Sequence, residues 1–350
     1  MGLRRKASPV PGRVGVLLVN TGTPDEPTPR AVARYLARFL MDRRIRPMNR
    51  VGWWLILHVG IIPRRKRASA EKYAAIWTEE GSPLAVTQAR LARGLDGWYR
   101  EAGADVVVRQ AMSYGAPSIA SALRELREAG CARLVALPLY PQAAFSTTGA
   151  AGDGVARALR RLRWDVPCQV VPDYHDDALY VRALAAAIRN AGFDPSPDAG
   201  DRLLFSFHSI PLADIEAGDV YELQAGATAL AVAGELGIDR RRWTIGYQCR
   251  FDKGRAWLAP FTSATLATWA HAAPEPRTFV VCPGFSIDCL ETLYDVKCEL
   301  RPAYLESGGR RLAYVPCLNA TRAHLRVLAH VLAPYVGAPD SPTERSPHER

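Results

Sequence analysis

Short apolar runs rich in β-forming residues alternate with stretches of helical period, and this alternation constrains the fold more than any other feature. Such alternation is typical of α/β proteins. Runs such as RLVALPLY and RTFVVC are apolar at nearly every position, as expected for strands of a parallel sheet covered by helices on both faces. Eight runs divide into two groups of four, which predicts two similar doubly wound, Rossmann-like lobes with four-stranded parallel sheets. The runs cover residues 14–20, 104–112, 133–139, 168–172, 202–207, 243–247, 277–282 and 311–315.

The predicted domain organisation follows these runs. The N-terminal lobe is expected at 13–160 and the C-terminal lobe at 161–320, followed by a helix over 321–336. Residues 1–12 and the Pro-rich, polar tail at 337–350 are expected to be disordered. No dinucleotide-binding or P-loop motif is present. Because ligands of doubly wound folds bind beyond the carboxyl ends of the strands, residues that follow the strands are the candidates for a functional site.

The charge balance is basic, with 45 Lys+Arg against 35 Asp+Glu and a net charge of +10. The basic runs are short and dispersed, and no nucleic-acid-binding motif accompanies them, so no nucleic acid is predicted as a partner. Acidic small molecules or an anionic membrane surface fit the charge better. Forty of the 45 basic residues are arginines, which indicates either anion recognition by guanidinium groups or the base composition of the genome.

The cysteines indicate a reducing compartment. There are seven, an odd number, and none forms a C-x-x-C pair, which argues against a disulfide framework and against a zinc ribbon. The apolar stretch after the basic N-terminus is too short for the core of a signal peptide. A cytoplasmic protein is therefore expected.

One segment has the composition of a membrane-facing surface. Residues 51–62 (VGWWLILHVGII) are nearly all apolar and lie between Arg50 and the basic run 64–67, yet they are too short for a span of about 20 residues. A buried core helix explains the segment. The alternative is an exposed apolar lip, with Trp53 and Trp54 at the level of the headgroups and the arginines on anionic lipid.

A histidine ends one predicted strand. In LLFSFHSIP (203–211) the apolar run terminates at His208 and a proline follows three residues later, which would place His208 at the ligand-binding edge. A lone histidine at a strand end is more often structural than catalytic, so both interpretations stay open.

Carboxylates follow a second predicted strand. Segment 280–296 predicts a strand, a Pro-Gly turn and a helix that begins near Asp288 and carries Glu291. Acidic residues in a first turn are favoured by the helix dipole, so a capping role explains them. Their spacing also places Asp288, Glu291 and Asp295 on one helix face, where they could pass a cation or protons inward. With His208 they would hold a divalent metal transiently, since a tight structural site needs about four ligands.

The segments that carry these residues resemble, in order along the chain, those of the ferrochelatase family, which inserts ferrous iron into a porphyrin in the last step of haem synthesis. The resemblance covers nearly the whole chain outside residues 1–12 and the tail after about 336. It rests on residues 15–44, KYAAIWTEEGSPL (72–84), MSYGAPS (112–118), LPLYPQAAFSTTGA (137–150), LLFSFHSIP (203–211), GYQCRF (246–251), AWLAPFT (256–262), CPGFSIDCLETL (282–293) and LNAT (318–321).

The resemblance implies a chelatase-like fold with the active-site cleft between the lobes, and roles for particular residues. His208 matches the essential histidine of the family and Glu291 the glutamate of its D-x-x-E-T-L helix, and both would contact the metal. Asp288 would be a second carboxylate on the metal path, and the lip at 51–62 would be the rim that admits an apolar tetrapyrrole. The residues expected to contact the macrocycle are Ser113, Tyr114, Trp257 and Phe285.

No tightly bound cofactor is implied, and Fe²⁺ is a substrate. Some relatives hold a [2Fe–2S] cluster, but here Phe145 occupies the loop that supplies one cysteine, and no cysteine follows Cys317. Because such clusters need four thiolates, none is predicted. The chain also departs from the family at Cys249, which stands where serine is common, and at 252–253, so contacts there are left open.

The expected reaction is the insertion of Fe²⁺ into protoporphyrin IX to form protohaem with release of two protons, which makes the protein a lyase. His208 would accept a pyrrole proton or bind the iron first, because imidazole serves either role near neutrality. Glu291, assisted by Asp288, would conduct protons out or metal in. The alternatives are another tetrapyrrole chelatase, acting on coproporphyrin or sirohydrochlorin, and a two-lobed protein that binds haem or metal without catalysis. Peripheral contact with the inner face of the membrane is a further expectation.

Overall fold

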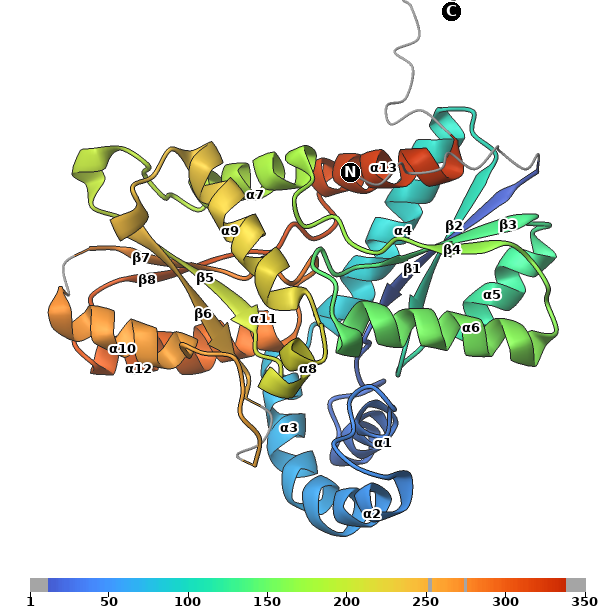
Figure 1. The fold of residues 1–350 in the computed structure, drawn as a ribbon, viewed down its shortest axis with the longest axis horizontal. Coiled ribbons are helices and arrows are strands. Elements are labelled where there is room, and N and C mark those ends of the chain that lie inside the picture. Colours follow the sequence, from blue (N-terminus) through green and yellow to red (C-terminus); the bar gives the residue numbers. More distant parts are fainter. Residues whose placement is uncertain (1–11, 251–253, 274–275, 338–350) are drawn as a thin grey trace, which may run out of the picture.

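The computed structural model describes residues 12–250, 254–273 and 276–337 and contains two four-stranded parallel sheets (Figure 1). Both sheets have the same strand order, in which the first strand of each lobe lies between its second and third, so the prediction of two similar doubly wound lobes is confirmed. The first sheet, in the order β2-β1-β3-β4, contains β1 (Val14–Asn20), β2 (Val106–Met112), β3 (Arg133–Pro138) and β4 (Cys168–Val170). The second, in the order β6-β5-β7-β8, contains β5 (Arg202–His208), β6 (Trp243–Gln248), β7 (Thr278–Val281) and β8 (Leu312–Val315).

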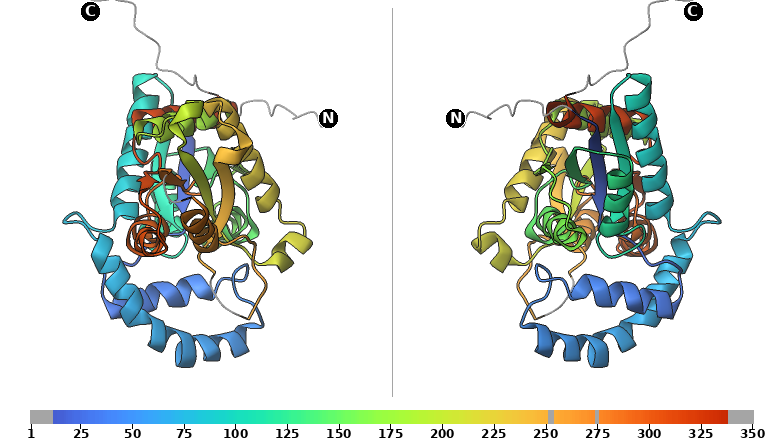
Figure 2. Two further views of the ribbon diagram at one scale, coloured as in Figure 1. Left: turned by 90° about the vertical axis from the view of Figure 1, so that its left-hand side faces the viewer. Right: turned by 90° about the vertical axis from the view of Figure 1, so that its right-hand side faces the viewer.

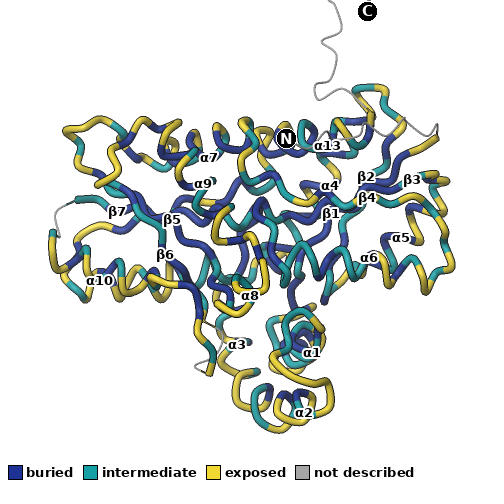
Figure 3. Tube along the Cα trace, in the orientation of Figure 1, coloured by how far each residue is buried: buried dark blue, intermediate teal, exposed yellow. Residues whose placement is uncertain are grey.

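Helices cover both faces of each sheet, and one buried core continues through both lobes. It includes Val16 and Leu137 from the first sheet and Phe205 and Phe207 from the second. The central strands are buried along their length, whereas exposed residues lie on the outer helical surfaces (Figure 3). The covering helices are α4 (Pro83–Glu101), α5 (Ile119–Glu128), α6 (Ala150–Leu162), α7 (Ala178–Asn190), α8 (Leu212–Glu216), α9 (Tyr221–Leu236), α10 (Thr262–Ala272), α11 (Leu290–Tyr294), α12 (Arg301–Glu306) and α13 (Arg322–Val336), with short helical turns at Phe145–Gly149, Pro197–Ala199, Arg240–Arg242 and Asp295–Leu300.

The structure extends the first sheet past one predicted lobe boundary and begins the last helix close to the other. Strand β4 pairs with β3, with Leu134 opposite Cys168, so the first sheet continues beyond residue 160, where the first lobe was expected to end. Helix α13 begins where the C-terminal helix was expected, and the Arg133 guanidinium of the first lobe donates to the carbonyls of its last turn, including that of Val336 at 2.7 Å. Residues 1–11 and 338–350, which were expected to be disordered, lie outside the described residues. So do residues 251–253, which include the positions 252–253 where the sequence departs from the family.

A helical projection lies beyond the carboxyl ends of the strands. It contains α1 (Pro29–Leu40), α2 (Arg50–Leu55), the π-helical turn Ile56–Ile61 and α3 (Ile62–Ile76), and Figures 1 and 2 show it below the two sheets. In Figure 1 the arrowheads of β1 and β5 both point toward the middle of the molecule, above this projection. None of the helices in the described part of the chain combines the length and the apolar character needed to cross a bilayer.

The lip at 51–62 is exposed on one side and anchored on the other. Val51, Val59 and Trp54 are 79%, 69% and 50% exposed, whereas Leu57 is fully buried. Trp53 is also buried, and its indole N–H donates to the Leu40 carbonyl at 2.6 Å. The lip alternative is therefore favoured over a buried core helix, but the placement of Trp53 at the headgroups was wrong. Contiguous exposed apolar residues of this kind are rare on monomeric proteins unless they contact something.

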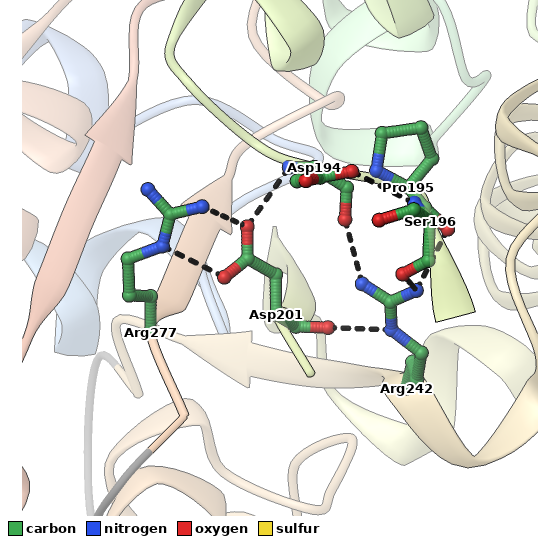
Figure 4. Close-up of polar contacts among 6 residues, drawn as sticks. All are labelled: Asp194, Pro195, Ser196, Asp201, Arg242 and Arg277. Carbon is green, nitrogen blue, oxygen red and sulfur yellow. Dashed lines mark hydrogen bonds and ion pairs between the residues drawn. The ribbon is translucent and has the colours of Figure 1, made fainter. Parts of the chain in front are cut away.

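Two arginines of the basic excess are used by the fold at the amino edge of the second sheet (Figure 4). Arg277 forms a bidentate pair with the fully buried Asp201, at 2.8 and 2.6 Å. Arg242 donates to the carbonyl of Asp201 at 2.8 Å and to the three carbonyls of residues 194–196 at 2.7 Å each. Satisfying buried polar groups in this way is a structural role, so the arginine count overstates the charge available to an anionic ligand.

Candidate active site

His208 ends β5, the strand at which the order of the second sheet reverses. Ligands of doubly wound folds bind at this reversal. The turn after His208 is fixed by Ser209, which is fully buried, donates its N–H to the Gln248 carbonyl at 2.8 Å and its hydroxyl to the Leu258 carbonyl at 2.9 Å. His208 Nδ1 lies 2.6 Å from the Ser209 carbonyl oxygen, an atom that only accepts. In the neutral ring Nδ1 therefore carries the proton, and Nε2 has a free lone pair.

Glu291 lies in the first turn of α11, which follows β7, the neighbour of β5. Gln248 connects the two candidates. Its side-chain Nε2 donates to the Glu291 backbone carbonyl at 2.9 Å, and its Oε1 accepts from the Ser206 hydroxyl of β5 at 2.6 Å. The backbone carbonyl of Gln248 accepts the N–H of Ser209. Gln248 thus links the turn after His208, through its backbone carbonyl, to the first turn of α11, through its side-chain amide. The Glu291 carboxylate takes no part in these bonds.

Asp288 does not lie on the helix face with Glu291, and that part of the prediction was wrong. Helix α11 begins at Leu290 with Cys289 as its N-cap, so Asp288 precedes the helix. Its buried carboxylate accepts hydrogen bonds from Thr292 at 3.0 Å, from Asn319 at 2.8 Å and from the Tyr314 hydroxyl. A carboxylate with this many donors holds the loop in place, and it has little capacity left for a metal.

Glu291, Asp295 and Glu299 follow one another at intervals of four residues and form the carboxylate row. The pKa of Asp295 is raised to about 6, mainly by burial and also by the charge of Glu291, while a hydrogen bond from Cys249 Sγ at 2.8 Å and the charge of Lys72 oppose the shift. Cys249 holds this place with φ 62°, in the left-handed region. Glu299 lies one turn further along. The side chains of Asp295 and Glu299 are 20% and 48% exposed, so the row of carboxylates leads outward to the surface.

The first lobe and the projection also contact this region. Tyr174 and Ser286 share a hydrogen bond of 2.7 Å, and the Tyr180 hydroxyl donates to the Pro283 carbonyl at 2.6 Å, which fixes the loop before α11 against the neighbouring elements. Burial raises the pKa of Tyr73 on α3, and the Glu291 charge raises it as well. The same two causes raise the pKa of Tyr140, which follows β3 and hydrogen-bonds with Thr21 after β1. The charge of Glu291 therefore acts on residues of both the first lobe and the projection.

The four residues expected to contact the macrocycle lie in different surroundings. Ser113 and Tyr114 follow β2, and the buried Tyr114 ring packs against Phe39 of α1 with centroids 5.2 Å apart. Trp257 is buried with the Arg255 guanidinium 4.9 Å from its ring centre, and Phe285 is half-buried after β7. The hydroxyl of Tyr114 and the indole N–H of Trp257 are buried and make no hydrogen bond within the described residues.

Two surface hollows lie elsewhere. Both are at the amino ends of β1 and β2, opposite the strand ends that carry the candidates, and neither contains a predicted site residue. They are lined by residues that include Arg13, Asp96, Arg100, Asp105 and Arg133.

Comparison with known proteins decides the family. The family model described as Ferrochelatase matches residues 13–334. The chain belongs to the ferrochelatase family. Ferrochelatases of Thioalkalivibrio sulfidiphilus and Nitrosococcus oceani are 44% and 41% identical over 323 and 324 residues, which cover 92% and 93% of this chain and 86% and 87% of theirs. That of Aromatoleum aromaticum is 42% identical over 328 residues, covering 93% of this chain and 89% of its own.

Solved structures confirm the chelatase-like fold. SirB from Bacillus subtilis with Fe³⁺ superposes with a TM-score of 0.54 at 11% identity, covering 92% of this chain and 96% of its own. The sirohydrochlorin chelatase SirB from B. subtilis subspecies spizizenii with cobalt superposes with a TM-score of 0.52 at 12% identity, covering 92% of this chain and 95% of its own. As a ferrochelatase the protein is a metal chelatase, a lyase of haem biosynthesis, and its substrates are a porphyrin and ferrous iron.

Sequence reasoning missed Gln248 and Lys72, which the structure places at the candidate site. A signal existed for Gln248, because it is a polar residue at the end of an apolar strand, in register with His208. Lys72 lies on α3, 223 residues before Asp295, and nothing local in the sequence connects it to α11.

Proposed function

We propose that this ferrochelatase inserts Fe²⁺ into protoporphyrin IX at the edge formed by His208 and Glu291, with release of two protons. The observation that carries the proposal is the position of Gln248. Its backbone carbonyl holds the turn after His208 and its side-chain amide holds the first turn of α11, where the strand order reverses. One imidazole and one carboxylate are too few to retain a metal tightly, which suits an ion that must be passed on.

His208 would act through Nε2. Metallation requires two pyrrole N–H protons to leave while the nitrogen lone pairs face the ion, and a flat macrocycle cannot arrange this easily. A pocket that binds a saddled porphyrin would supply about 1–5 kcal/mol of strain from apolar contacts elsewhere on the ring. With Nδ1–H fixed on the Ser209 carbonyl, Nε2 is free to accept a pyrrole proton or to bind the iron first.

Glu291, Asp295 and Glu299 would carry the metal in or the protons out. They recur every four residues along α11 and the π-helical turn Asp295–Leu300, and exposure increases outward from Asp295 to Glu299. Carboxylates bind divalent first-row metals without strong selection among them. Asp288 would assist only by positioning the loop, since its carboxylate is already hydrogen-bonded.

The absence of a tightly bound cofactor is also a proposal. A [2Fe–2S] cluster needs four convergent thiolates. All seven cysteines are free thiols, and Phe145 stands in the loop that supplies one cluster cysteine in some relatives. The contacts of Ser113, Tyr114, Trp257 and Phe285 with the macrocycle remain part of the proposal.

The function is tested by anaerobic incubation of the purified protein with Fe²⁺ and either protoporphyrin IX, coproporphyrin or sirohydrochlorin. We expect protein-dependent conversion of protoporphyrin IX to haem, seen as a progressive shift of the Soret band. Zinc should be inserted as well, because imidazole and carboxylate ligands select weakly between the two metals. Faster turnover of coproporphyrin or sirohydrochlorin would support another chelatase, and a shifted Soret band without turnover would support a protein that only binds haem.

The lip at 51–62 would contact an anionic membrane from the cytoplasm. The exposed apolar residues Val51, Trp54 and Val59 lie between Arg50 and the basic run 64–67, an arrangement suited to the interface of a bilayer with anionic lipid. The seven free cysteines suit a reducing cytoplasm. Membrane contact at the rim would let an apolar porphyrin pass to the site without crossing water.

The double variant Trp54→Asp/Val59→Asp should bind vesicles of mixed anionic and neutral phospholipid at least about tenfold more weakly than the wild type, because two apolar groups no longer enter the interface. Co-sedimentation measures this. Leu223→Asp is the control, since Leu223 is 77% exposed and lies on α9, outside the projection that carries the lip. Equal binding by the double variant and the wild type would contradict the membrane contact.

A further inference from the structure

The ammonium of Lys72 lies over the outer end of the carboxylate row. Lys72 Nζ is 2.6 Å from Glu299 Oε1 and 3.9 Å from Asp295 Oδ1, and it lies 5.0 Å from the centre of the Tyr294 ring. Its side chain is one-third exposed, so water reaches it. The carboxylates of Asp295 and Glu299, which lie between the surface and Glu291 on this route, thus both interact with the ammonium of Lys72.

The position of Lys72 is imposed by packing. Its neighbours Ala70 and Tyr73 on α3 are buried in a small cluster with Val32 of α1, and Leu290, the first residue of α11, packs against this cluster. Helix α3 is therefore fixed against α11 in the register that places Lys72 above Asp295. Most surface ion pairs of exposed side chains are loosely held, but this one lies between two packed helices.

We propose that Lys72 is a positioning residue that keeps the metal affinity of the Asp295–Glu299 pair low, and that ferrous iron displaces its ammonium on the way to Glu291. This inference rests on the proposed function of the carboxylate row. A route that delivers an ion must bind it weakly enough to release it, and two carboxylates without a compensating charge would retain a divalent cation. A lysine suits the task because its ammonium is a compact charge on a flexible stem and can move aside.

The test is Lys72→Met. Removing one positive charge within 4 Å of both carboxylates should lower the Kd of Zn²⁺ for the porphyrin-free protein by about three- to tenfold, measured by calorimetric titration. The KM for Fe²⁺ should fall by a similar factor without an increase in kcat, and the KM for porphyrin should stay within about twofold. Lys72→Arg, which keeps the charge, should restore wild-type metal affinity.

Lys297→Met is the matched control, because it removes one positive charge from the helical turn that carries Asp295 and Glu299, where Lys297 lies over the Tyr314 ring. The proposal is overturned if Lys72→Met leaves both metal constants within twofold of the wild type, or if Lys297→Met raises the affinity as much, which would show a long-range charge effect. The titration needs no turnover. Failure of the wild type to metallate a porphyrin would therefore contradict the proposed function, and the effect of Lys72 on Zn²⁺ binding would still be measured.

Discussion

Replacing His208 with alanine should lower kcat for iron insertion by about 10²- to 10⁴-fold, the range expected when a proton acceptor at the reacting atoms is lost. The fold should persist, because the buried Ser209 fixes the turn through its N–H and hydroxyl, and neither bond involves the imidazole. Steady-state rates under anaerobic conditions measure the effect, with thermal unfolding as the check on folding.

His271→Ala is the matched control for this variant. His271 lies on α10, and its Nδ1 is also hydrogen-bonded to a backbone carbonyl, that of Ala267 at 2.7 Å. It should retain wild-type kcat. The KM for metal separates the two roles of His208: a large increase in His208→Ala indicates that the imidazole binds iron first, and an unchanged value indicates a proton acceptor. Wild-type kcat in His208→Ala would remove the residue from the mechanism.

Glu291→Gln should lower kcat by about 10²-fold and raise the KM for Fe²⁺ and for Zn²⁺, because the amide can neither accept a proton nor neutralise a cation. The substitution is nearly isosteric. It also preserves the bond from Gln248, which goes to the backbone carbonyl of residue 291 and not to the side chain. Rates measured over a range of metal concentrations give both constants.

Glu306→Gln, at an exposed position at the end of α12, is the control and should behave as the wild type. If Glu291→Gln kept both kcat and the metal KM, the carboxylate row would not be the route, and another path to His208 would have to be sought. An increase in metal KM alone would restrict Glu291 to delivery and leave the proton transfer to other groups.

The strands could be predicted from the sequence because their apolar runs are local. The bounds of β1 were predicted without error, and those of β5 and β6 within one residue at each end. The candidates His208 and Glu291 followed from a general rule about strand ends together with the resemblance. Asp288 was misplaced because the helix start depends on the N-cap Cys289, a residue type that is not a typical cap.

Contacts between distant segments could not be predicted from one sequence. The ammonium of Lys72 reaches Asp295 and Glu299 only because α3 packs against α11, and this packing leaves no local pattern in the sequence. The lip illustrates a smaller limit. Its apolar composition was evident, but which of two adjacent tryptophans turns inward depends on the Leu40 carbonyl.

The core that continues from Val16 through Phe207 has a consequence for how substrate enters and haem leaves. Two lobes that share their apolar interior cannot open as a hinged clamp without exposing that interior to water, at about 25 cal/mol for each Å² of apolar surface. We therefore expect any opening that admits the porphyrin and releases haem to occur in the projection of α1 to α3, and the two sheets to keep their relative position.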